Sequence, residues 1–169
     1  MLETGATVRC QAPLIKGVND AAETWAELWT REVRAGAIPY YMFVERDTGA
    51  RRYFEVPLAR ALDVYRGAIR TASGLAGTAR GPVMSATAGK VQIDGLVTTD
   101  HGQAFVLKLI RARNSGLTNR IELAAFDSAA TWLDDLSRDG EPGVMPFSQP
   151  ARAGDLPASE PELLDSLAG

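Results

Sequence analysis

The sequence is poor in the residues that build disulfides and metal centres. It contains one cysteine, Cys10, and one histidine, His101, among 169 residues. A single thiol cannot form an internal disulfide framework, and one cysteine cannot by itself hold a zinc ion or an iron–sulfur cluster. We therefore expect a fold that depends on its hydrophobic core and has no metal site of its own.

Long apolar runs and blocks of basic residues are also missing. No apolar stretch approaches the roughly 18 residues of a membrane span, and residues 1–10 have neither the cationic nor the apolar region of a signal peptide. The net charge of −3 and the lack of a basic–aromatic patch argue against a nucleic-acid partner. Because 46% of the residues are hydrophobic and 23% are charged, the composition is that of a globular protein. These features predict a cytoplasmic protein that binds neither nucleic acid nor membrane.

Residues 1–71 consist of alternating strand-like and helix-like stretches. Residues 6–14 and 38–43 predict two buried strands. A capping-box spacing at Asp20 predicts the start of a helix after the first strand, and Pro57 suits the first turn of a helix after the second. The order strand–helix–strand–helix predicts parallel strands joined by crossover helices.

Residues 72–137 have a different pattern. A loop of small residues is predicted for residues 73–89, and beyond it the alternation of apolar and polar residues predicts antiparallel strands. The predicted elements are strands at 90–97, 104–110 and 121–126, a hairpin turn at 100–102 and a short helix at 129–136. Residues 138–169 are rich in Pro, Gly, Ala and acidic residues, which predicts a disordered tail with a transient helix at 160–167.

Four segments of the chain resemble the lysine 2,3-aminomutase family. The string QAPLIKGVND, residues 11–20, is similar to the family's Q-x-x-L-x-x-G-V-N-D segment, and PYY at 39–41 is similar to its P-Y-Y strand. SGLA at 73–76 resembles its S-G-x-A segment, and Lys90 stands where the family's glycine-rich loop ends in a lysine. The order and spacing of all four are far more specific than any one of them.

The resemblance implies an α/β fold: a fragment of a parallel (β/α) radical SAM barrel, its last βα units, followed by a small β-rich C-terminal segment. Its divisions would be barrel units in residues 1–71, a cofactor segment with a β-hairpin in 72–137, and the tail in 138–169. Parallel strands are normally covered on both faces, and here one edge of the sheet would be left without a neighbour. We therefore expect the chain to be part of a larger protein or half of an assembly.

The resemblance also implies a reaction that this chain lacks the parts to perform alone. In the family, a C-x-x-x-C-x-x-C loop holds a [4Fe–4S] cluster, which cleaves S-adenosylmethionine. The resulting radical moves an amino group held as an imine on pyridoxal phosphate. The sequence has no such loop, and Cys10 does not replace it. We expect no activity from the chain alone and predict a partner, either an N-terminal radical SAM half or a second copy.

Two residues are implied as cofactor contacts. Lys90 matches the lysine that forms the Schiff base with pyridoxal phosphate. The residues alone also allow a solvated lysine that opens an antiparallel strand. Gln11 would lie near S-adenosylmethionine, and Asn19 and Asp20 are better explained as helix caps. No residue is predicted to be catalytic in its own right.

The substrate contacts implied by the resemblance are Glu45, Arg46 and Asp47, which follow the PYY strand. Lysine-specific members bind the distal ammonium with two aspartates, and the nearest matches here are Arg46 and Val83. An arginine repels an ammonium and a valine offers it no hydrogen bond, so lysine is disfavoured as the substrate. Glu45 or Asp47 could compensate, or all three residues could form a solvated turn. Arg52 and Arg80 could contact a phosphate or carboxylate through their guanidinium groups but are interpreted mainly as surface charges, and His101 is interpreted as a solvated turn residue.

The leading hypothesis is the C-terminal portion of a lysine 2,3-aminomutase-like protein that needs a partner half. The alternative is a non-catalytic remnant or binding module, which would fit a Met1 that falls within a helix-to-strand connection of the family. A small β-rich interaction domain in residues 73–136 is a third interpretation.

Overall fold

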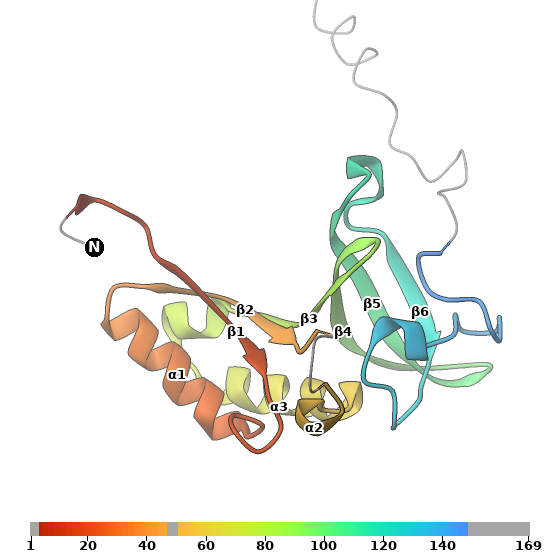
Figure 1. Cartoon of the computed structure of the whole chain (residues 1–169), viewed down its shortest axis with the longest axis horizontal. Coiled ribbons are helices and arrows are strands. Elements are labelled where there is room, and N and C mark those ends of the chain that lie inside the picture. The colour runs from red at the N-terminus through yellow and green to blue at the C-terminus, as the bar shows by residue number, and fades with distance from the viewer. Residues whose placement is uncertain (1–3, 47–50, 149–169) are drawn as a thin grey trace, which may run out of the picture.

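The computed structural model describes residues 4–46 and 51–148. They form a single six-stranded sheet in which the strands follow one another in chain order (Figure 1). The strands are β1 (Arg9–Leu14), β2 (Ile38–Val44), β3 (Arg80–Ala86), β4 (Gly89–Thr99), β5 (Gly102–Ala112) and β6 (Ile121–Ala125). The helices are α1 (Ala22–Arg34), α2 (Arg51–Phe54) and α3 (Leu58–Thr71), with short 3₁₀ turns at Gly74–Thr78, Ser115–Leu117 and Leu133–Asp135.

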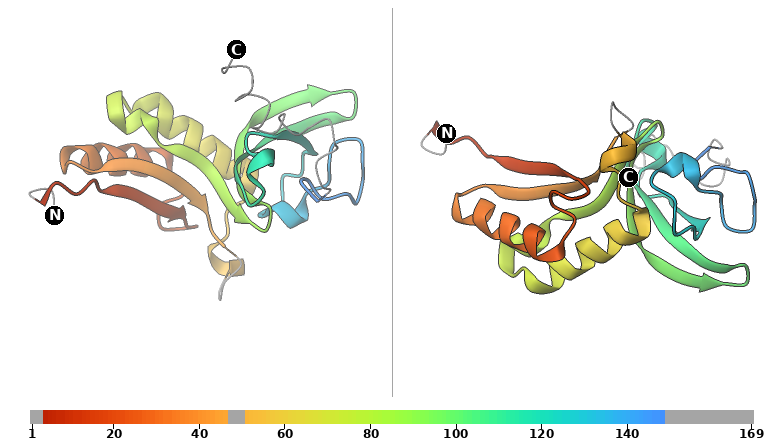
Figure 2. Two further views of the ribbon diagram at one scale, coloured as in Figure 1. Left: turned by 90° about the horizontal axis from the view of Figure 1, so that it is seen from above. Right: turned by 60° about the horizontal axis from the view of Figure 1, so that its bottom comes forward.

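The first half of the sheet is parallel and carries its helices on one face. β1 pairs with β2, and β2 with β3, in parallel register. The helices α1 and α3 lie side by side on these strands (Figure 2). Trp25 and Trp29 recur at helical spacing on α1 and are buried against Leu14 of β1 and Met42 of β2. The predicted crossover connections are therefore present.

The second half of the sheet is antiparallel. β3 pairs with β4, β4 with β5 and β5 with β6 in sequence, so each strand is joined to the next by a short connection. Alternate residues of β5, namely Phe105, Leu107 and Leu109, are buried in a second cluster that also takes Leu58 and Leu62 from α3. Since α3 contributes to both clusters, the two halves share one continuous core.

The segment that follows β6 covers the core face of the antiparallel half. Trp132, Leu133 and Leu136 pack into the second cluster. Residues 138–148, the described part of the predicted tail, are fixed to β6 at Glu122, which is 8% exposed. Its carboxylate accepts hydrogen bonds from Arg138 at 3.2 Å and from the backbone N–H of Phe147 at 2.8 Å. The helix predicted at 160–167 lies outside the described residues.

The predicted fold class, a fragment of a parallel (β/α) radical SAM barrel, is wrong for this structure. The sheet is mixed, because β4 pairs antiparallel with β3 and carries the sheet onward into a meander. A barrel requires each strand to be followed by a crossover helix and a further parallel strand, whereas β3 is followed directly by a hairpin. The β-rich segment is thus a continuation of the parallel strands and not an appendage to them.

Three local expectations also change. Asp20 does not cap α1, which begins at Ala22 without a side-chain cap. Asn19 instead closes the loop before α1, since its amide oxygen accepts from the Ile15 N–H at 2.6 Å and its amide nitrogen donates to the Pro13 carbonyl at 2.9 Å. The predicted helix at 129–136 is only a 3₁₀ turn. Within the described part of the chain, no helix is long and apolar enough to span a membrane.

Candidate functional site

A cavity of about 310 Å³ opens where the parallel strands end. Its walls come from the carboxyl-terminal parts of β1, β2 and β3, from the residues after β2, and from the start of β4. The lining residues are Gln11, Ala12, Pro13, Phe43, Val44, Arg46, Ser85 and Lys90. Ligands of open α/β sheets bind outside the carboxyl ends of the strands, so this position is the one expected of a site.

The strand pattern explains why polar side chains reach this cavity. Successive side chains of a strand point to opposite faces of the sheet. Met84 of β3 and Val91 of β4 are fully buried in the core under the sheet. Their neighbours Ser85 and Lys90 therefore project to the opposite face, where the register pairs them directly.

The amine of Lys90 is held in place by an aromatic ring and a hydroxyl. Its Nζ lies 4.4 Å from the ring centroid of Phe43 and 5.8 Å from that of Tyr41. It donates a hydrogen bond of 3.3 Å to the Oγ of Ser85. These contacts fix a half-buried amine at the edge of the cavity, with part of its hydration shell replaced by ring faces.

The surroundings of Lys90 disfavour its protonated form. Burial lowers the pKa of the Lys90 amine, and the positive charges of Arg111 and Arg46 lower it further. Tyr40 acts in the opposite direction, but the net shift is downward. A lysine with a lowered pKa has more neutral amine at a given pH, which is the form that attacks a carbonyl carbon.

An irregularity in β2 brings two tyrosines together beside this amine. Cys10 of β1 pairs with Pro39 and the next residue, Gln11, pairs with Tyr41, so the register passes over Tyr40. A bulge places adjacent side chains together, and here the rings of Tyr40 and Tyr41 lie 3.9 Å apart between centroids. A hydrogen bond from Tyr41 lowers the pKa of Tyr40, and nearby arginines add to the effect. The pKa of the buried Tyr41 is raised, first of all by burial.

Three of the predicted site residues meet in this cavity. Gln11, Arg46 and Lys90 all line it, although they are far apart in the sequence. Glu45 is half-buried and is not a lining residue. Asp47 lies outside the described residues.

The other residues considered from the sequence lie elsewhere. Val83 is fully buried in β3. Arg52 on α2 and Arg80 at the start of β3 are exposed and do not line the cavity. His101 is exposed in the turn between β4 and β5.

The residues that sequence reasoning missed are those that depend on register. Ser85 and Phe43 contact Lys90, and Arg111 is its cross-strand partner on β5. Ser85 lies in the segment predicted as a loop of small residues, so its pairing with Lys90 gave no signal. The alternation of apolar and polar residues around Lys108 predicted a strand, and Arg111 lies near the end of that strand. The pattern did not predict which residue of the neighbouring strand Arg111 would face.

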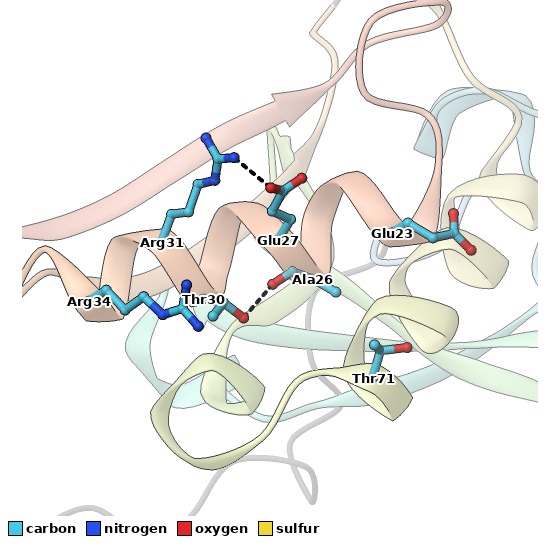
Figure 3. Close-up of a pocket in the computed structure, with 7 residues that line it drawn as sticks. All are labelled: Glu23, Ala26, Glu27, Thr30, Arg31, Arg34 and Thr71. Carbon is cyan, nitrogen blue, oxygen red and sulfur yellow. Dashed lines mark hydrogen bonds and ion pairs between the residues drawn. The ribbon is translucent and has the colours of Figure 1, made fainter.

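A larger groove of about 410 Å³ is lined by residues of α1 together with Thr71, the last residue of α3 (Figure 3). Three of its side chains are already engaged: Arg31 pairs with Glu27 at 2.6 Å, and the Thr30 hydroxyl donates to the Ala26 carbonyl at 2.7 Å. The Arg31 and Glu27 side chains are 73% and 63% exposed, so they form a solvated surface pair. This groove lacks the desolvated polar group that distinguishes the Lys90 cavity.

The described residues contain no group of three or more His, Cys, Asp or Glu side chains that could hold a metal ion. Cys10 is half-buried on β1. Burial raises the pKa of its thiol, and the charge of Glu32 raises it further. A thiol with a raised pKa is a poor metal ligand, because the thiolate is the form that binds metal.

Comparison with known proteins supports the sequence resemblance. No family model matches the chain. A curated protein of Aquifex aeolicus (strain VF5), named "Putative L-lysine 2,3-aminomutase", is 31% identical to it over 133 residues. The match covers 79% of this chain but only 34% of that protein, so the chain spans about a third of its relative's length. Most of this chain is therefore similar to a part of a protein that carries the lysine 2,3-aminomutase name.

Proposed function

We propose that this chain is the cofactor-binding part of a lysine 2,3-aminomutase-like radical SAM enzyme. Such an enzyme moves an amino group along an amino acid with the help of pyridoxal phosphate. The observation that carries the proposal is the position of Lys90, whose partly desolvated amine faces a cavity at the carboxyl ends of the parallel strands. The similarity to the Aquifex protein supports the same assignment.

The residues present fit pyridoxal phosphate. The cavity of about 310 Å³ is within the range of small-ligand sites, which begins near 300 Å³. Lys90 would hold the cofactor through its aldehyde carbon, and the hydrogen bond to Ser85 fixes the direction of the amine. Bound there, the cofactor would carry the amino group of the amino acid while it changes carbon.

This chain would favour attachment of the cofactor by lowering the pKa of the Lys90 amine. Because burial and two arginines disfavour the ammonium form, less energy is needed to release the proton before the amine attacks. Phe43 covers the amine on one side and limits its access to water. Gln11, which lines the same cavity, is the residue we expect to contact S-adenosylmethionine through its amide.

The radical generator must come from another part of the assembly. The chain's single cysteine, Cys10, cannot ligate a cluster that takes three thiolates. In the described structure β1 pairs only with β2, so its other edge offers backbone groups for a further strand. We propose that an N-terminal radical SAM half docks along this edge by strand addition.

The test is chemical trapping at Lys90. The full chain is incubated with pyridoxal phosphate and reduced with borohydride, and the modified lysine is identified by peptide mass spectrometry. The chain has only three lysines, so Lys16 and Lys108 serve as internal references. We expect modification to concentrate on Lys90 and the total yield to fall sharply in Lys90→Arg, while Lys16→Arg and Lys108→Arg behave as the unmodified sequence does.

Equal modification of all three lysines would remove Lys90 from the cofactor role. In that case the alternative interpretation, a non-catalytic binding module, would replace the enzyme. We expect Lys90→Arg to stay folded, because the arginine head can turn toward solvent while its stem stays packed. Circular dichroism checks that a lower yield of trapped cofactor does not come from unfolding.

A further inference from the structure

A second cavity, of about 230 Å³, is formed by the β5–β6 connection, the β3–β4 turn and residues 147–148. It is separate from the Lys90 cavity, because the two have no lining residue in common. Its apolar lining includes Leu109, Leu117 and Phe147, and its polar lining includes Arg113, Asn114 and Arg120. An apolar lining with a few polar groups is the usual composition of a small-ligand site.

The apolar part of this cavity belongs to the hydrophobic core. Leu109 is 1% exposed and lies in the second cluster, and Leu117 and Phe147 pack against that cluster. An apolar cavity of about 150 Å³ is large enough to bind benzene. The cavity beside Leu109 therefore has room for one six-membered ring, or a branched aliphatic group, with a small polar substituent.

The polar part of the lining carries a net positive charge. Arg120, whose side chain is 21% exposed, pairs with Glu122 at 2.8 Å. Arg138 shares Glu122 and also pairs with Glu141, so these two carboxylates balance these two guanidinium groups. Arg113 forms no ion pair with the residues that the structure describes. Its charge is therefore the one that a ligand of this cavity would neutralise.

Two lining side chains are fixed by one hydrogen bond each and have further donors. The Nε of Arg113 donates to the Thr87 carbonyl at 2.7 Å, which anchors the guanidinium to the β3–β4 turn. The amide oxygen of Asn114 accepts from the Gly116 N–H at 3.1 Å, so its NH₂ group is the end that can donate to a ligand. Guanidinium and amide NH₂ groups both donate, and together they suit the two oxygens of a carboxylate.

We propose that this cavity binds a small monocarboxylic acid with an apolar body. The ring or branched chain would lie on Leu109, Leu117 and Phe147, and the carboxylate would bind Arg113 and Asn114. A neutral ligand would leave the Arg113 charge without a counter-ion, and a cationic ligand would be repelled by it. This ligand site goes beyond the proposed function and does not depend on it, since the cofactor would attach in the other cavity.

Three ring compounds of similar size test the preference for a carboxylate on the full chain: benzoate, benzamide and benzylamine. Each is titrated while amide and methyl chemical shifts are followed by NMR. We expect saturable shifts at Leu109 and Leu117 with benzoate, and none with benzylamine. Benzamide should bind about tenfold more weakly than benzoate, because it loses the charge-assisted hydrogen bonds.

Two variants on the exposed rim then locate the effect. Arg113→Gln should weaken benzoate binding by about tenfold and leave benzamide binding nearly unchanged, so the preference is lost. Asn114→Asp keeps the oxygen that accepts from the Gly116 N–H and adds a negative charge, so it should weaken benzoate more than benzamide. The control is Arg34→Gln, which removes an exposed charge from α1 and should leave all titrations unchanged.

Three results would overturn the inference. Equal binding of benzoate and benzamide would mean that Arg113 does not recognise the carboxylate. Shifts confined to the surroundings of Lys90 would place the acid in the other cavity. Nuclear Overhauser contacts between Leu117 and residues after 148 in the ligand-free chain would show that the chain itself fills the site. Each result is compatible with trapping of pyridoxal phosphate at Lys90, so each is distinguishable from failure of the proposed function.

Discussion

At the scale of single residues, the surroundings of the Lys90 amine act on its protonation state. Burial lowers its pKa, and the positive charges of Arg111 and Arg46 lower it further. Removing one of these charges favours the protonated form, so Arg46→Gln should raise the pKa of Lys90. At a fixed mildly alkaline pH the variant then has less neutral amine, and Lys90 should react more slowly with a limiting amount of acetic anhydride.

Peptide mass spectrometry of the acetylated chain over a series of pH values measures this shift, with Lys16 and Lys108 as references in the same sample. Arg34→Gln controls for a change in overall charge. An identical Lys90 titration in Arg46→Gln and the unmodified chain would mean that Arg46 does not act on the amine.

A second residue-scale prediction concerns Glu122, the buried anchor of residues 138–148. Its carboxylate pairs with Arg120 at 2.8 Å and Arg138 at 3.2 Å and accepts the Phe147 N–H. Glu122→Ala leaves two partly buried arginines without this partner, so we expect it to lower the free energy of unfolding by about 3 kcal/mol. Urea unfolding measures the loss.

The matched control is Glu27→Ala, which removes a carboxylate from the exposed pair with Arg31. Because surface pairs contribute little, its effect should stay within about 0.5 kcal/mol. Limited proteolysis should also cleave Glu122→Ala after residue 137 sooner than the unmodified chain. Similar losses in the two variants would show that the Glu122 network does not fix the segment.

Several residues of the candidate site could be predicted from motifs, but the contacts between them could not. Lys90, Gln11 and Arg46 were singled out from short strings, and the structure brings all three to one cavity. Ser85 and Arg111 could not be found in that way, because their closeness to Lys90 depends on strand register. A one-residue shift of register would move each of them to the other face of the sheet.

At the scale of elements, β3 is the strand that the sequence conceals. Its short apolar core, Val83 and Met84, is preceded by Gly81 and Pro82, which break any period-two pattern. The structure explains the glycine, since a Cβ at Gly81 would lie 2.8 Å from the Cβ of Met42 on β2. The residue that made this segment look like a loop is the one that allows β3 to pack closely.

Gly89 provides an element-scale prediction for the β3–β4 hairpin. It has a φ of +140°, and an added Cβ would overlap the backbone carbonyl of Arg111 on β5. Gly89→Ala should therefore push β4 away from β5 and destabilise the chain by more than about 2 kcal/mol. It should also reduce trapping of pyridoxal phosphate, because Lys90 is the next residue.

Gly102 is the matched control for this strain. It also opens a strand and has a φ of +114°, but a Cβ there meets nothing within 4 Å. Gly102→Ala thus carries the backbone strain alone, about 1 kcal/mol, without the overlap. The difference in urea midpoint between the two variants isolates the packing effect, and equal midpoints would contradict it.

At the scale of the whole molecule, the sequence predicted the individual strands and crossovers better than the way in which the strands join into one sheet. The crossover order of the first two strands and the later hairpin were both predicted, and both are present. Whether parallel strands close into a barrel depends on what pairs with the last of them. Here that partner is β4, and the antiparallel pairing of Ser85 with Lys90 joins the two patterns into one sheet.

This continuity predicts how the molecule unfolds. A fragment of a barrel with an appended segment would lose its two parts separately. In this structure the two clusters are joined through α3, and the N–H of Leu58 at its start donates to the Ala130 carbonyl at 2.8 Å. We therefore expect one cooperative transition in urea, with both clusters lost together.

The three tryptophans allow each cluster to be followed by itself. Trp25 and Trp29 are buried under the parallel strands, and Trp132 is buried against the antiparallel ones. Trp132→Phe leaves fluorescence only from the first cluster, and the double variant Trp25→Phe/Trp29→Phe leaves it only from the second. Within each variant, the fluorescence midpoint should coincide with the midpoint from circular dichroism, whatever the substitution does to stability. A fluorescence midpoint displaced from the circular dichroism midpoint in either variant would mean that the clusters unfold independently, and that the continuous sheet does not couple the Lys90 hairpin to the parallel strands beside it.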